Sequence, residues 1–319
     1  MRARILTVAA AFVAGGIVPA GAADPQLVNL VMPNAAVVAG VNVDSAKTSV
    51  FGQFVISQIQ GPEVQQLAAA TGFNPTQDVS EVLAASGGPA TKSGLLLARG
   101  TFNASQIEAA AVAKGGTTTE NYNGVMILEG PKQTHGVAFL NNNTIAVAGD
   151  LASVKGAIDR QNSAAASLPA AVVTAIAQWS GTEDAWVVST VPPSSLHTPA
   201  RAPAIPGVGQ NGGNAAFQNI QSAAGGVKFG DTSAAFTAQA VADNAQDATA
   251  MVNAIQLLAS MGQLQSQGQN NANLQALVQS LKVTADGTAI NISFSLPESD
   301  LQTMLKPHAV HGHRPLVRQ

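Results

Sequence analysis

The feature that most constrains the fold is a series of short apolar or alternating segments separated by tight-turn residues. The clearest turn is Asp286-Gly287, a pair typical of type I′ hairpins. Every second position after it is apolar, with Asn or Ser between: Ile290, Ile292, Phe294 and Leu296. This alternation predicts a strand with one buried and one solvated face. Tight hairpins of this kind join antiparallel strands.

Strands and helices are predicted along the rest of the chain. Asn103 with Gln106, Asp150 and Asn244 each begin a predicted helix as capping residues. The predicted strands are 35–44, 93–99, 119–129, 134–140, 144–148, 184–191, 226–230, 233–241, 281–285 and 290–296, and 78–85 is either strand or helix. The predicted helices are 44–60, 62–71, 103–114, one that begins at Asp150, the part of 163–180 that follows Pro169, 214–223, 244–263, 274–280 and one or two last helical turns in 297–306. We therefore expect an α+β fold with antiparallel or mixed sheets, packed by helices on one face.

The chain divides into two halves of similar plan, 23–162 and 163–306. Each half runs from a strand and helix through a group of antiparallel strands to a further helix. An internal duplication would explain this, and so would the ordinary order of elements in an α+β protein. Residues 192–213 are rich in Pro and Gly and predict a linker or a long surface loop. Residues 263–273 predict a polar connector, and 307–319 a basic tail.

Residues 1–22 have the pattern of a secretory signal peptide. Arg2 and Arg4 precede an apolar stretch, 5–18, which is shorter than the roughly 20 residues that a membrane span needs. Ala20-Gly21-Ala22 then offers small residues for cleavage before Ala23, and a cut after Ala23 fits nearly as well. We expect a periplasmic or extracellular protein with no membrane span once the signal is cleaved.

Composition excludes several classes of function. The chain has no Cys, which excludes disulfides, thiolate catalysis and Cys-type metal sites. Only 10% of its 319 residues are charged, the net charge is −3 and the pI is near 5.9, which argues against a nucleic-acid partner. Hydrophobic residues make up 46%, enough for a packed core. No cofactor is expected.

Two motifs resemble functional sites, but the sequence around them argues against those functions. Residues 207–212 match G-x-G-x-x-G, but the Pro-rich segment before them cannot be a central parallel strand, so we interpret them as a loop. His197 lies beside Ser194 and Ser195 in the same loop, and adjacency in sequence does not create triad geometry. His135 is interpreted as a surface or edge residue.

Other candidates receive structural interpretations. His308, His311 and His313 in the tail are weak candidates for adventitious metal binding, with no carboxylate nearby to complete a site. Acidic residues that precede a strand or open a helix are expected to act in the architecture: Glu183, Asp184, Glu298 and Asp300. Trp179, Trp186 and Tyr122 are too few for a stacking platform, and the two Trp residues are expected in the core.

Three stretches resemble exported bacterial proteins whose function is unassigned. They are 30–33 through 51–54, 72–75 through 78–85, and 147–155. The resemblance implies an exported α+β protein and supplies no site residues.

We expect an exported, non-catalytic protein that acts by contact with a protein or surface. This rests on the export signal, the low charge and the absence of a catalytic motif. Two alternatives stay open: a module that binds a small molecule or lipid, and a hydrolase without a recognisable motif. The partner and the oligomeric state are not predicted.

Overall fold

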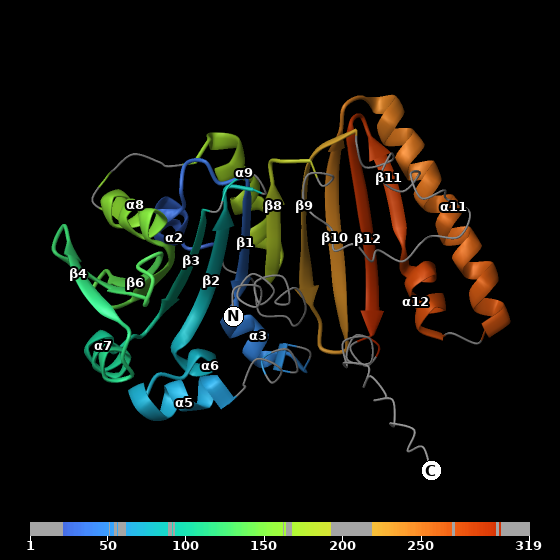
Figure 1. Cartoon of the computed structure of the whole chain (residues 1–319). Coiled ribbons are helices and arrows are strands. Elements are labelled where there is room, and N and C mark those ends of the chain that lie inside the picture. The colour runs from blue at the N-terminus through green and yellow to red at the C-terminus, as the bar shows by residue number, and fades with distance from the viewer. Residues whose placement is uncertain are drawn as a thin grey trace, which may run out of the picture.

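The computed structural model describes residues 22–50, 52–53, 56, 62–88, 91, 93–161, 163, 168–192, 219–269, 272–297 and 300. Their architecture is α+β, as the sequence predicts, with one antiparallel sheet of twelve strands. The strand order is β11-β12-β10-β9-β8-β1-β2-β3-β7-β6-β5-β4, and Figure 1 shows the sheet running across the molecule between β4 and β11.

The strands are β1 (Val37–Asn42), β2 (Val79–Ser86), β3 (Gly94–Gly100), β4 (Thr118–Tyr122), β5 (Val125–Glu129), β6 (His135–Leu140), β7 (Ile145–Asp150), β8 (Ala185–Ser189), β9 (Ile220–Phe229), β10 (Ser233–Ala242), β11 (Lys282–Asp286) and β12 (Ala289–Pro297). The helices are α2 (Pro25–Leu30), α3 (Val43–Thr48), α5 (Pro62–Thr71), α6 (Pro75–Asp78), α7 (Ala104–Ala113), α8 (Leu151–Gln161), α9 (Ala170–Thr182), α11 (Ala245–Gln269) and α12 (Ala272–Ser280).

Helices α2, α8 and α9 cover one face of the sheet, which we call the α8 face. Their side chains pack on β1–β3 and β5–β8 in the largest core cluster. Alternate positions on these strands are fully or almost fully buried there, among them Val38, Leu83, Leu97, Val147 and Val188. This end of the molecule is therefore sealed on one side by a conventional apolar core.

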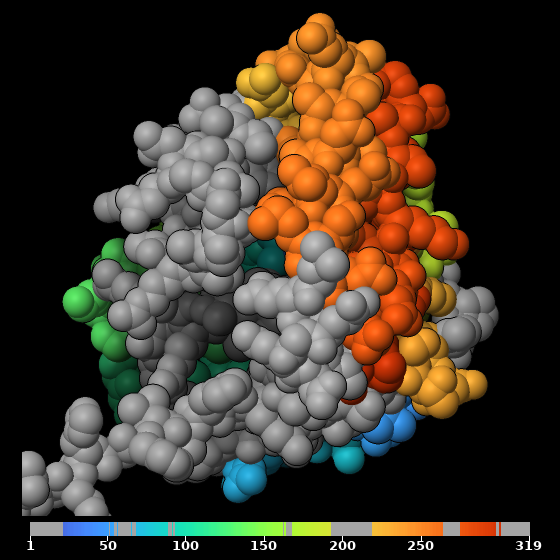
Figure 2. Space-filling model, turned by 90° about the vertical axis from the view of Figure 1, so that its right-hand side faces the viewer, coloured from blue at the N-terminus to red at the C-terminus, as the bar shows by residue number. Residues whose placement is uncertain are grey.

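Helices α11 and α12 lie on the opposite side, which we call the α11 face. Helix α11 packs on β10–β12 through a cluster that includes Met251, Val252 and Ile290. Figure 2 shows α11 as the outermost layer at this end, with the red β11–β12 region beside it. A second cluster on the same face packs α3 and Phe102 against the ends of the central strands. Helices thus cover both faces of one continuous sheet, a different face at each end.

Tight turns form where the sequence predicts them. The hairpin between β11 and β12 forms at the predicted place, but its loop is Gly287-Thr288: Gly287 has a φ of 58°, while Asp286 pairs with Ala289, so the predicted type I′ pair Asp286-Gly287 is shifted by one residue. Asn141, Asn142 and Asn143 all have positive φ between β6 and β7, a conformation that Asn tolerates better than other non-glycine residues. The hairpins fix the antiparallel register of the sheet.

Four predicted elements differ from the structure. The predicted helix 214–223 is wrong from residue 220 onward, because β9 begins at Ile220 and pairs with β8 and β10 on its two sides. The polar connector 263–273 is helical up to Gln269, because Gln favours helix and no Pro interrupts the segment.

The predicted helix 44–60 breaks at Ser49, which is extended and whose Oγ accepts the Gly52 amide hydrogen. The predicted strand 119–129 is a hairpin, since Asn123 and Gly124 adopt positive φ.

Candidate functional site

The most distinctive surface of the described residues is an apolar row that crosses the α11 face. We call it the transverse row: Val137, Ala148, Leu96, Ala84, Ala39 and Val187, on β6, β7, β3, β2, β1 and β8. Each residue is paired in register with the next, so the row is perpendicular to the strands. At about 4.8 Å between strands, six strands give a row roughly 24 Å long.

All six residues of the row are half-buried, although the neighbouring residues on the same strands belong to core clusters. On the same strands, the alternate positions are buried under α8 and α9. One ladder step away on the α11 face, Val41, Val82, Ala98 and Ala146 belong to the core cluster around Phe102. None of the six belongs to a core cluster formed by the described residues. The row is therefore a strip of apolar sheet with incomplete burial.

The row continues beyond β8 toward α11. Gly225 on β9 pairs with Val187, Ala238 on β10 pairs with Gly225, and Ile292 on β12 pairs with Ala238. The strip is made largely of Ala, Val and Gly, so its floor is low and no charged side chain lies in it. Ligand sites are lined predominantly by apolar side chains, so a strip of this composition is suited to contact with an apolar group.

Helix α11 adds exposed apolar residues along one side. Ala250, Ala254, Leu257 and Met261 recur at helical spacing, and Leu257 is 62% exposed and Met261 44% exposed. We call these four residues the α11 stripe. After Asp247 the helix has no charged residue. Exposed apolar side chains that lie together on one helix face are typical of a contact surface.

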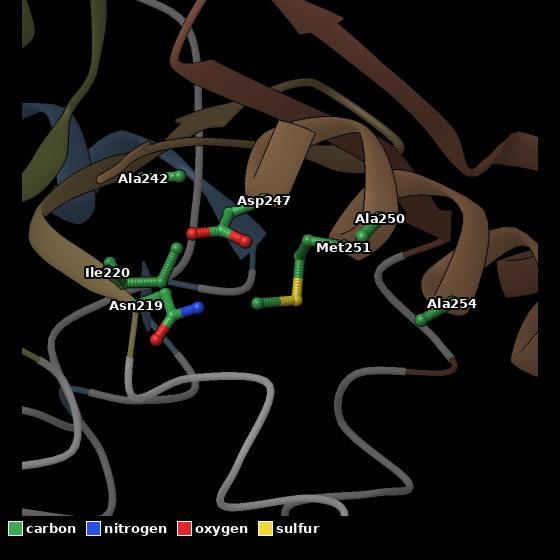
Figure 3. A pocket seen from close by; sticks show the side chains of 7 residues that line it. All are labelled: Asn219, Ile220, Ala242, Asp247, Ala250, Met251 and Ala254. Carbon is green, nitrogen blue, oxygen red and sulfur yellow. The ribbon is translucent and has the colours of Figure 1, made fainter. Parts of the chain in front are cut away.

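A small pocket shows which way the α11 stripe faces. It has a volume of about 140 Å³ and is lined by Asn219, Ile220, Ala242, Asp247, Ala250, Met251 and Ala254. In Figure 3, Met251 extends from α11 toward Asn219, and the Asp247 carboxylate points toward Ile220. Because Ala250 and Ala254 share the pocket with Ile220 of β9, the stripe faces the β9 side of α11. The pocket is below the 300–1,000 Å³ of usual ligand sites, so it is not a site by itself.

The α8 face of strands β10–β12 has the opposite character. Gln239 donates from Nε2 to Asn291 Oδ1 at 2.9 Å across β10 and β12, and Ser293 and Thr284 lie on the same face. The strands at this end are therefore polar on one face and apolar on the other. The contrast confirms the alternation predicted for 290–296.

Glu183 and Asp184 form a buried acidic pair between α9 and β8. Asp184 is fully buried; it accepts from Lys228 Nζ and from the Phe229 amide, both at 3.0 Å. Glu183 Oε1 accepts from Thr237 Oγ1 at 2.7 Å, while Oε2 is buried without a hydrogen-bond partner. Burial raises the pKa of Glu183. These contacts join α9, β9 and β10, in keeping with the architectural role predicted for both acids.

A second cluster surrounds the start of α2. The Asp24 carboxylate pairs with Arg99 and caps the Gln26 amide, while both Glu81 oxygens lie 3.2 Å from the Asp24 amide nitrogen. Burial raises the pKa of Glu81 to about 7. Ala23, itself buried, donates its backbone N–H to Ser180 Oγ of α9 at 2.9 Å. The sequence gives no local signal for this cluster, because its members are far apart in the chain.

The remaining candidates have ordinary surroundings. Trp179 and Trp186 are buried, as predicted. Tyr122 donates to Asp159 Oδ2 at 3.1 Å, and Lys155 lies 5.2 Å from the centre of its ring. His135 is exposed beside Thr134.

Several predicted features lie outside the described residues: the signal stretch up to Gly21, the loop from Pro193 on with its G-x-G-x-x-G stretch, Ser194, Ser195, His197, Glu298, and the tail with His308, His311 and His313. Within the described part of the chain, no three His, Asp or Glu side chains are grouped to hold a metal ion. No helix in that part is long and apolar enough to cross a membrane.

Comparison with known proteins supports the fold alone. No family model and no curated protein matches the chain. Crystal form III of TP0453 is similar to it, with 11% identity and a TM-score of 0.55 over 88% of this chain and 98% of that one. Crystal form IV gives 12% identity and a TM-score of 0.55 over 89% and 97%. At such identity the likeness concerns the arrangement of the α+β fold, which both chains share almost from end to end.

Proposed function

We propose that the protein is an exported, non-catalytic binding protein that holds an apolar, chain-shaped molecule along the transverse row. The observation that carries this is the half-burial of six register-paired apolar residues on a sheet whose other face is sealed by helices. Burying such a strip against a hydrocarbon chain is favourable in proportion to the apolar area removed from water.

The dimensions favour a flexible hydrocarbon chain over a compact ring system. The row is roughly 24 Å long, and one acyl chain spans about half of a 30 Å bilayer core. Three of the six residues of the row are Ala (Ala148, Ala84 and Ala39), and the larger side chains are Leu96 between Ala148 and Ala84 and a Val at either end. An extended acyl chain of a fatty acid or lipid therefore fits along the row, with the α11 stripe on the side toward β9.

The proposal is tested by titrating the purified protein with dansyl-undecanoic acid, a fluorescent fatty-acid probe. We expect saturable fluorescence enhancement in wild type. In Ala84→Phe, a ring fills the centre of the row, and we expect affinity to fall about tenfold or more, equivalent to about 1.4 kcal/mol. Ala235→Phe is the matched control, because Ala235 is half-buried on the α8 face of β10. Equal binding by all three proteins, or none by wild type, would sink the proposal.

The exposed α11 stripe favours a second function, contact with another protein. On α11, Leu257 has most of its surface in solvent, and Met261 has nearly half of its surface in solvent. A photo-crosslinking residue at position 257 should give a discrete adduct in cells that export the protein, and one at Glu108 on α7 should not. If neither position gives an adduct while the probe still binds, the acyl-chain function stands and the protein contact does not.

A further inference from the structure

We infer that the mature chain begins at Ala23 and that its new α-ammonium supplies the positive charge that the half-buried Asp24–Glu81–Arg99 cluster lacks. The inference is independent of the acyl-chain proposal. It rests on the contacts of Ala23 and on the charges beneath it.

Ala23 is the first buried residue in the described part of the chain. Ala22 is exposed, whereas Ala23 is 8% exposed and belongs to the largest core cluster. Its backbone nitrogen donates to Ser180 Oγ, and Ser180 is itself buried. A cut before Ala23 keeps these contacts, and a cut after it loses them. Of the two cleavage positions that the sequence leaves open, the packing favours the first.

The charges around this nitrogen do not balance. Asp24 and Glu81 share one cation, because Arg99 pairs with Asp24 and is also the cross-strand neighbour of Glu81, whose pKa its charge lowers. Glu81 is held by the Asp24 amide, and its pKa is raised because burial disfavours the charged form. The surroundings of the Ala23 nitrogen are therefore net negative.

Cleavage before Ala23 converts an amide into an ammonium at this point. One residue separates it from the Asp24 nitrogen, which is 3.2 Å from each Glu81 oxygen, so the ammonium lies within about 7 Å of the carboxylate. An opposite charge favours the ionised acid and the protonated amine, the more strongly the closer the two charges lie. Removing the signal peptide thus places a positive charge near the half-buried Glu81 carboxylate, and the attraction between them helps to hold the start of α2 against the sheet.

The inference predicts that one substitution has opposite effects before and after processing. Glu81→Gln removes a half-buried carboxylate from the unprocessed chain of 319 residues. At pH 7 it should raise Tm of that precursor by a few degrees. In the processed protein the same substitution removes the partner of the ammonium and should lower Tm by a similar amount. Glu108→Gln on α7 is the control and should shift neither form.

The experiment expresses the full-length gene in two ways, with export for the processed form and in the cytoplasm for the precursor. Intact mass of the exported protein must give a chain that starts at Ala23; any other start overturns the inference. A Tm shift of the same sign for Glu81→Gln in the precursor and in the processed protein also overturns the inference. If Glu81→Gln does not fold, Ser180→Ala in the processed protein replaces it. That variant should speed reaction of the α-amine with an acylating reagent at pH 7, and an unchanged rate counts against burial of the amine.

Discussion

Gly40 in the centre of β1 makes the sharpest test of how the α8 face is packed. It pairs with Trp186 of β8. A Cβ at position 40 would lie 2.4 Å from Trp186 Cζ2 and 2.5 Å from Cε2. Carbon atoms in contact are normally 3.5–4.0 Å apart, so the indole would have to move by about 1 Å. Trp186 is only 3% exposed and belongs to the largest core cluster, and side chains in a protein core are closely packed.

We therefore expect Gly40→Ala to destabilise the protein by about 1–3 kcal/mol, the usual cost of overpacking a core. Without the clash, Gly40→Ala would stabilise the protein, because Ala in place of Gly in a helix or strand stabilises by about 0.5–1 kcal/mol. Urea unfolding, followed by fluorescence and circular dichroism, measures the difference. For a chain of this size 1 kcal/mol corresponds to a Tm shift of about 2–4 °C.

Gly181→Ala in α9 is the matched control. A Cβ there would meet no atom within 4 Å, so helix propensity alone predicts stabilisation of up to about 1 kcal/mol. Trp186→Phe should relieve part of the clash, so the double variant with Gly40→Ala should be more stable than the sum of the two single effects predicts. A Gly40→Ala protein at least as stable as wild type would refute the packing described for this face.

Two further predictions concern buried or capping acids. Burial raises the pKa of Glu183, so folding favours its protonated form; stability is greatest below its ordinary pKa of 4.5 and is lost as pH rises through the raised value. The unfolding free energy of Glu183→Gln, measured with urea, should not show this decrease as the pH rises. If the stability of the variant and of wild type changes with pH in the same way, the prediction is wrong. Asp150 accepts from the amides of Ser153 and Gly94, both at 2.9 Å, so Asp150→Ala should cost about 1–2 kcal/mol at pH 7. Burial opposes ionisation of Asp150, but the hydrogen bonds from Ser153 and Gly94 leave its pKa below 3.8. The difference in unfolding free energy between wild type and Asp150→Ala should therefore become smaller as the pH falls through that lowered pKa. A difference that stays constant with pH would contradict the capping role of Asp150.

Local physics explains why much of the secondary structure follows from sequence. Asn103 and Asp150 cap helices at the predicted positions, and Gly287 adopts the left-handed conformation that the predicted turn needs. Each of these effects acts within about four residues, so the nearest neighbours in the chain are sufficient to specify it. The α+β class follows from such local patterns.

Two segments were decided by pairing over longer distances. Residues 220–223 are locally ambiguous, and they become strand because β8 and β10 supply hydrogen-bond partners on both sides. Segment 79–86, which the sequence left open between strand and helix, is β2 for the same reason, between β1 and β3.

The candidate site was not visible in the sequence. The strands that carry the transverse row are apolar on both faces, so nothing in Leu95-Leu96-Leu97 tells which residue is buried and which is half-exposed. The α11 stripe is equally ambiguous, since an apolar helical face predicts burial by default.

The sequence by itself determined the local elements, the hairpin turns, the absence of thiol chemistry and the low charge, because these depend on residue type and near neighbours. Only the tertiary structure decided that the strands form one sheet, that its two ends are covered on opposite faces, and that Ala23, Ser180 and Glu81 meet. Such contacts join residues more than fifty positions apart, and their geometry exists only once the whole sheet is assembled.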